Sequence, residues 1–123
     1  MSRTSEISGF YKLSIKDRLK VVQEFAGLTD KDVELLSSTG ALGLEQADRM
    51  IENVVGVFPL PLGIATNFLV NGKDYFVPMT IEEPSVVAAA SNAAKMARQK
   101  GGFTATTTPP IMIGQIQLTN VPD

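Results

Sequence analysis

The chain has 123 residues, of which 44% are hydrophobic and 20% are charged, and its formal net charge is −2. This length and composition fit one globular domain and argue against intrinsic disorder. The small negative charge argues against binding to nucleic acid or to anionic membranes, and no run of ~18 apolar residues is available to span a bilayer. Residues 1–6 lack the apolar core of a signal peptide, so we expect a cytoplasmic location.

The sequence contains neither cysteine nor histidine. Without cysteine, the chain has no disulfide framework, thiol nucleophile or thiolate metal site. Without histidine, it lacks the commonest general base near neutral pH and the commonest metal ligand. Ser–His catalysis within this chain is therefore excluded, and we expect no metal site.

The N-terminal region shows helical patterns with recognisable start and stop signals. Ser14 is the expected N-cap of a helix over residues 15–26. Thr29 begins a second helix that ends by Gly40, and a third, shorter helix is expected over residues 44 to about 51. We interpret all three as packing helices, because they carry no chemically unusual side chain.

The middle of the chain is predicted to form a β-hairpin. Residues 54–63 hold two prolines and two glycines, which excludes a continuous helix. Two β-like runs follow at 64–70 and 75–79, and the Asn71-Gly72 pair between them is a strong hairpin signal because both residues tolerate positive φ.

An alanine-rich helix and a β-like tail complete the expected α+β fold. We expect the helix to begin with Pro84 at its first position and to end at Gly101-Gly102. It carries six alanines between residues 88 and 97, so another backbone or a ligand can approach closely. Residues 103–118 read as two strands that are interrupted by the proline pair at 109–110.

The run Glu82-Glu83-Pro84-Ser85 places ionisable groups at the start of this helix. Adjacent carboxylates on extended backbone point in opposite directions, so we expect one to be buried among apolar neighbours and the other to be exposed. A desolvated carboxyl group can stay protonated and give a proton to a substrate oxygen. The hydroxyl of Ser85 and the first-turn N–H groups can hold a carboxylate or phosphate. Acidic residues before proline are also common helix-capping chemistry, so the local pattern leaves a structural role open.

Four motifs in the middle of the chain resemble, in order and spacing, those of 3-hydroxy-3-methylglutaryl-CoA reductases. They are ENVVG at 52–56, LPLGIA at 60–65, VPM at 77–79 and EEPSVVAAAS at 82–91. The Glu-Pro-Ser form resembles the class found in bacteria and archaea, and not the animal class. The likeness covers roughly residues 45–118.

This resemblance implies an oxidoreductase that interconverts 3-hydroxy-3-methylglutaryl-CoA with mevalonate and CoA, using two NAD(P)H. It implies that Glu83 is the catalytic acid beside the reacting oxygen and that Ser85 helps to bind the hydroxymethylglutaryl group. A neutral carboxylic acid suits that place, because the oxygen gains negative charge. Glu52, Asn53 and Gly56 are implied to belong to a dimer interface, so a homodimer or higher homo-oligomer is expected.

The resemblance does not extend to the residues that complete the family's active site. The family's catalytic lysine, aspartate and histidine lie downstream of these motifs, and no Gly-x-Gly-x-x-Gly occurs in this chain. Residues 1–108 are expected to be the N-terminal part of the large substrate-binding and dimerisation domain, and 109–123 the truncated start of the small NAD(P)-binding domain. We therefore expect an N-terminal piece of a longer or split reductase that is inactive alone. The alternative is a non-catalytic module that binds CoA thioesters or complements a partner chain.

Overall fold

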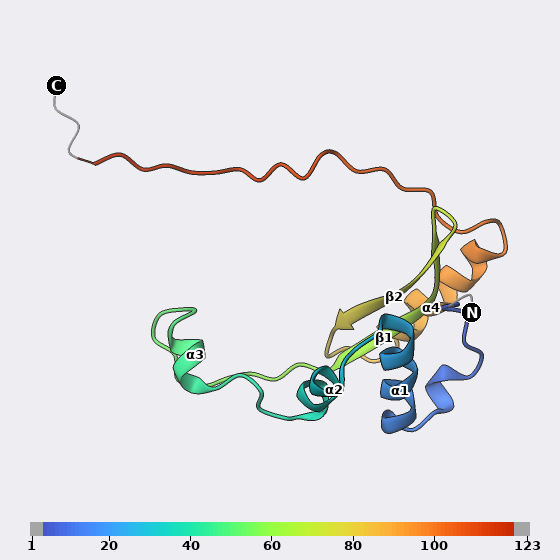
Figure 1. The fold of residues 1–123 in the computed structure, drawn as a ribbon, viewed down its shortest axis with the longest axis horizontal. Helices are drawn as coiled ribbons and strands as arrows, with labels where there is room; N and C mark the ends of the chain where they lie inside the picture. The colour runs from blue at the N-terminus through green and yellow to red at the C-terminus, as the bar shows by residue number, and fades with distance from the viewer. Residues whose placement is uncertain (1–3, 120–123) are drawn as a thin grey trace.

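The structure is a computed structural model that describes residues 4–119 (Figure 1). Its elements are η1 (Phe10–Lys12), α1 (Ile15–Ala26), α2 (Asp30–Ser37), α3 (Leu44–Asp48), β1 (Leu62–Val70), β2 (Lys73–Thr80) and α4 (Val86–Arg98). This order of helices and one antiparallel hairpin confirms the predicted α+β class.

The first two helices begin where their capping residues predict. The Ser14 hydroxyl accepts the N–H of Asp17 at 3.1 Å and caps α1. Thr29 and Asp32 form a capping box at the start of α2, in which each side chain accepts the other residue's N–H. The second helix ends at Ser37, and the third ends at Asp48, before the predicted residue 51. A five-residue helix has few internal hydrogen bonds to propagate it, so its end depends on surrounding contacts.

The hairpin turns at the predicted Asn71-Gly72 pair, and its strands are longer than predicted. Asn71 and Gly72 have φ values of 50° and 75°, the positive-φ pair of a type I′ turn. The strands pair from Leu62 opposite Thr80 to Val70 opposite Lys73, with a register shift between Ala65 and Phe68. This shift is a β-bulge, and Asn67 within it has a φ of 69°.

The core lies between the hairpin and the helices. Ala65 of β1 and Ala94 of α4 are fully buried. A Cβ atom at Gly63 would lie 3.1 Å from Val87, so the glycine lets α4 approach β1 closely. The ring of Phe25 in α1 stacks on Phe76 of β2, with centroids 4.1 Å apart.

The start of α4 differs from the prediction. Pro84 does not occupy the first helical position, because the helix begins at Val86 and Ser85 is its N-cap. Ser85 has a φ of 71°, in the left-handed region, and this breaks the helical backbone after Pro84. A non-glycine residue in that conformation is strained by about 1–3 kcal/mol, and such strain clusters at functional sites.

The predicted strands over 103–118 are wrong for the residues that the structure describes. Phe103 alone pairs with the hairpin, as a parallel bridge to Val70, and its N–H donates to the Leu69 carbonyl at 2.8 Å. Residues 104–119 form no strand. Ala105 is bonded to the Asn71 side chain of the turn, and the residues after it extend away from the hairpin (Figure 1). The β-branched pattern was not sufficient, because a strand also needs a neighbour to bond its backbone groups.

Candidate functional site

An open groove of about 970 Å³ lies where the hairpin, the start of α4 and the N-terminal segment meet. The hairpin contributes residues of β1, and the chain from the loop before α4 through that helix contributes Glu83, Ser85, Asn92 and Lys95. The third contribution is residues 6–12, and we call the whole hollow the Glu83 groove. The structure thus brings the two predicted site residues, Glu83 and Ser85, to one concave surface.

The two adjacent carboxylates occupy different surroundings, although not as predicted. Glu82 and Glu83 are both exposed, so the expected burial of one of them is wrong. They lie in the segment between β2 and α4 outside any regular element, where strand alternation does not hold. Of the two, only Glu83 lines the groove. Of the adjacent pair, therefore, Glu83 is the carboxyl group that can meet a ligand in the groove, which Glu6 of the N-terminal segment also lines.

Ser85 has a hydroxyl that α4 does not use. It is the N-cap residue, yet its side chain accepts no capping hydrogen bond. The first-turn N–H groups of a helix have no partner within the helix, and they attract anions together with the helix dipole. An exposed hydroxyl and a positive helix end therefore face the same groove at Ser85.

The hydroxyl of Ser91 links α4 to β1 beside the groove. Its Oγ donates to the Val87 carbonyl at 2.8 Å and accepts the N–H of Thr66 at 3.1 Å. The side-chain amide of Asn67 donates to the Ser91 carbonyl at 3.0 Å. These bonds join α4 to the bulge of β1, so Ser91 has a structural role here.

Three cationic side chains that sequence reasoning did not assign to the site also line the groove. They are Lys12, Arg18 and Lys95, from η1, α1 and α4. The Nε atom of Arg18 is buried and, within residues 4–119, has no hydrogen-bond partner. Lys95 lies in the last turn of α4, where its charge also complements the helix dipole. Nothing in the local sequence could have found this trio, since its members meet only in the folded chain.

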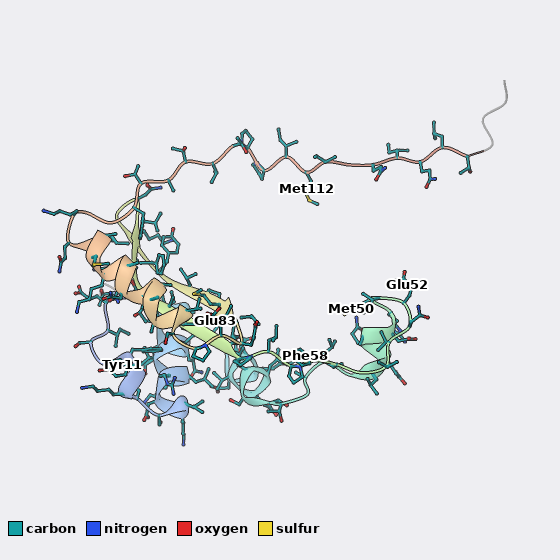
Figure 2. All side chains as sticks on the ribbon, turned by 180° about the vertical axis from the view of Figure 1, so that it is seen from behind. Tyr11, Met50, Glu52, Phe58, Glu83 and Met112 are labelled. Atoms are coloured by element: carbon teal, nitrogen blue, oxygen red, sulfur yellow. The ribbon has the colours of Figure 1, made fainter. Side chains whose placement is uncertain are left out.

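The predicted interface residues Glu52, Asn53 and Gly56 do not line the Glu83 groove. They lie just after α3, in the segment of residues 38–60, which we call the lobe and which stands apart from the hairpin. Figure 2 shows Glu52 on this lobe, far from Glu83. The apolar residues around them are open to solvent, with Val55 at 101% and Phe58 at 85% exposure. Within one chain, therefore, the ENVVG motif and the Glu83 groove form two separate surfaces.

Across residues 4–119, no group of three or more acidic, histidine or cysteine side chains is arranged to hold a metal ion. In the same part of the chain, no helix has the length and apolar character needed to cross a bilayer.

Comparison with known proteins identifies the class. The profile of the hydroxymethylglutaryl-coenzyme A reductase family matches residues 14–123, and the chain therefore belongs to this family. Over 118 residues it is 66% identical to the 3-hydroxy-3-methylglutaryl-coenzyme A reductase of Archaeoglobus fulgidus, covering 96% of this chain and 27% of that protein.

Solved structures show the same substructure. A 3-hydroxy-3-methylglutaryl-coenzyme A reductase from Streptococcus pneumoniae matches with a TM-score of 0.71 and 43% identity, over 79% of this chain and 23% of that one. A class II reductase structure from the same organism, bound to NADPH in open conformations, matches with the same TM-score over 26% of its chain. The chain thus spans about a quarter of the length of these relatives.

Proposed function

We propose that these residues supply one part of the active site of an oxidoreductase that interconverts 3-hydroxy-3-methylglutaryl-CoA with mevalonate and CoA, with two NAD(P)H as reductant. One observation carries the proposal: Glu83 and Ser85 line one groove, and the neighbouring Glu82 does not. The three cations of that groove support it too, because the substrate carries a carboxylate and phosphates.

Glu83 is proposed as the acid that hydrogen-bonds and helps to protonate the reacting oxygen. Ser85 is proposed to hold the hydroxymethylglutaryl group with its unused hydroxyl. Glu83 is exposed in this chain, and an acid that must stay protonated needs a less polar environment. We therefore propose that the parts of the reductase beyond this chain's span cover Glu83 and desolvate it.

NAD(P)H supplies the hydride in the proposed reaction, but the residues present here do not fit a dinucleotide site. A dinucleotide-binding unit needs a glycine-rich turn between a strand and a helix. The turn between β2 and α4 covers residues 81–85 and contains no glycine. We therefore assign no hydride-transfer step to this chain.

We propose that residues 1–108 belong to the large domain and that residues 109–123 begin the cofactor domain.

We also propose that the lobe around Glu52, Asn53 and Gly56 contacts a second subunit. The motif resemblance and the exposure of Val55 and Phe58 support this assignment. Because the lobe stands apart from the groove of its own chain, it is free to approach the groove of a partner.

The alternative function is a non-catalytic module that binds CoA thioesters or complements a partner chain. The groove and the exposed lobe favour it as much as they favour the enzyme, because neither feature requires turnover. Activity of the purified protein separates the two functions.

The first test measures substrate-dependent oxidation of NAD(P)H. We expect the protein from the complete reading frame, with any partner chain that copurifies, to be active, and the isolated 123-residue chain to be inactive. Turnover by the rigorously purified 123-residue chain would contradict the predicted inactivity. Absence of turnover by the complete protein, together with thioester binding in calorimetry, would favour the module.

The second test is Glu83→Gln in the complete protein, with Glu82→Gln as the matched control. We expect Glu83→Gln to lower kcat by about 10²- to 10⁴-fold, because it removes the acid but keeps the size of the side chain. Glu82→Gln should change kcat by less than about threefold, since Glu82 does not line the groove. Equal effects of the two substitutions would remove the assignment of the acid to Glu83.

A further inference from the structure

The N-terminal segment is attached to the hairpin at one fully buried residue, Ser5. Its backbone N–H donates to Oδ1 of Asp74 at 2.7 Å. Its hydroxyl lies 2.7 Å from the same oxygen and 3.0 Å from the Phe68 carbonyl oxygen, and can donate its proton to either. Asp74 stands near the beginning of β2, so these bonds join residues that are 69 positions apart in the sequence.

The bulge of β1 provides another bond to the same residue. The backbone N–H of Asn67 donates to the Ser5 carbonyl at 3.0 Å. This N–H is free for the purpose because the register shift between Ala65 and Phe68 takes Asn67 out of the strand ladder. The hydroxyl, N–H and carbonyl of Ser5 all bond to the hairpin, which explains why a polar residue can be fully buried here.

Arg98, in the last turn of α4, completes the attachment. Its Nη1 lies 2.7 Å from Oδ1 of Asp74, and its Nε lies 3.2 Å from Oε2 of Glu6. The side chains of Arg98 and Asp74 are each only 17% exposed, so solvent screens their ion pair less than one on the open surface. The hydrogen bond from Arg98, aided by those from Ser5, lowers the pKa of Asp74 to about 2. We call Ser5, Asp74 and Arg98 the N-terminal clasp.

The residues that follow the clasp form one wall of the Glu83 groove. Residues 6–12 line the groove, whereas Ser5, Asp74 and Arg98 do not. The far end of this wall is held by Phe10, whose ring contacts Phe76 of β2 with centroids 6.0 Å apart. The wall is therefore fixed at both ends, and the clasp is the polar attachment.

We propose that the N-terminal clasp positions the wall formed by residues 6–12 and thereby sets the affinity of the Glu83 groove for its substrate. Ser5, Asp74 and Arg98 are positioning residues, because they act through the wall and do not touch the groove. The inference rests on the proposed function for the identity of the substrate, a CoA thioester. Loss of the clasp leaves Glu83 and Ser85 in place, because they lie in the segment that joins β2 to α4 and not in the wall. It should therefore weaken substrate binding more than it slows the chemical step.

The experiment compares Asp74→Asn and Ser5→Ala with the wild type in the complete protein. Backbone hydrogen exchange, read by mass spectrometry without substrate, reports how firmly residues 6–12 are held. Steady-state kinetics with 3-hydroxy-3-methylglutaryl-CoA report KM and kcat. Arg98→Lys keeps the charge but loses the fork of donors, and it serves as the conservative variant.

Asp32→Asn is the matched control. Asp32 also accepts hydrogen bonds from a neighbour's N–H and hydroxyl, in the capping box of α2, but it does not line the groove. Its substitution should raise exchange only in α2 and leave KM unchanged.

We expect Asp74→Asn to raise KM about tenfold, with kcat within about twofold of the wild type, and to speed exchange over residues 6–12. Ser5→Ala and Arg98→Lys should cause smaller changes of the same kind, which keeps the test decisive if Asp74→Asn does not fold. Unchanged hydrogen exchange over residues 6–12 in the folded variants would contradict the proposal that the clasp holds the wall in place. Faster exchange with an unchanged KM would overturn the link to substrate affinity. An inactive wild type would remove the proposed function and the substrate role with it, while exchange would still decide whether the clasp holds the wall.

Discussion

The hairpin with α4 and the lobe around α3 are built in opposite ways. In the first region, α4, the N-terminal segment and Phe103 all bond to the same two strands. In the lobe, Ala47 is the one buried residue of 38–60. Large apolar side chains such as Val55 and Phe58 are open to solvent there. Contacts within the chain therefore hold the first region together. The lobe, in contrast, has apolar surface that contacts within the chain do not cover.

The largest expected effect separates the hairpin region from the tail. Gly102 has a φ of 82°, and a Cβ atom there would collide with the Leu69 carbonyl oxygen. We expect Gly102→Ala to reduce the free energy of unfolding by about 3 kcal/mol, because strain and a backbone clash add. Gly114→Ala is the control, since nothing lies within 4 Å of that position, and it should change stability by less than about 0.5 kcal/mol. Denaturant unfolding of both variants measures the difference, and equal losses would contradict the comparison.

The next prediction compares two phenylalanines. Phe25→Ala removes a ring stacked on Phe76 and should cost about 2 kcal/mol of stability. Phe58→Ala removes a ring that is 85% exposed and should leave unfolding nearly unchanged. If the lobe is a subunit contact, Phe58→Ala should instead weaken self-association in sedimentation velocity. Destabilisation by Phe58→Ala without any change in association would show that the lobe packs within its own chain.

The third prediction concerns acid. The folded-state pKa of Asp74, about 2, lies below its ordinary value of 3.8. Its contribution to stability is therefore complete above about pH 4 and is lost as the pH falls through about 2. Arg98 faces it from α4 and stays charged throughout, while Ser5 and Thr4 face it from the N-terminal segment.

Asp74→Asn should accordingly flatten the pH dependence of unfolding between about pH 4 and 2, by roughly 1–2 kcal/mol. Thermal unfolding across this range measures the effect. An identical pH slope in the wild type and the variant would show that Asp74 does not carry this dependence.

The smallest expected effect lies outside the hairpin. Thr29→Ala removes one half of the capping box of α2 and should cost about 1 kcal/mol. Thr29→Ser keeps the hydroxyl and should restore most of that loss. Circular dichroism during thermal unfolding measures both variants. A loss as large as that of Gly102→Ala would mean that α2 supports the hairpin more than its exposed residues indicate.

Much of the local structure could be predicted, because its causes are local. Ser14 and Thr29 begin their helices through bonds to residues three positions away. Asn71 and Gly72 specify the turn by their own tolerance of positive φ. The predictions were wrong where a partner decides the outcome, as in residues 104–119, which have the composition of strands but pair with none in the described chain.

The same distinction between local and long-range causes applies to the candidate site. The α+β class, the capping residues, the hairpin turn and the motif that indicates Glu83 and Ser85 could all be predicted from the order of the amino acids. Packing of distant segments was needed to show that Glu83 lines the groove without Glu82 and that Ser5 is held by Asp74. The same is true of the three cations in the groove, which are Lys12, Arg18 and Lys95. The physical reason is the range of the forces: caps and turns act over a few residues, whereas a groove and a buried ion pair exist only after distant segments have packed together.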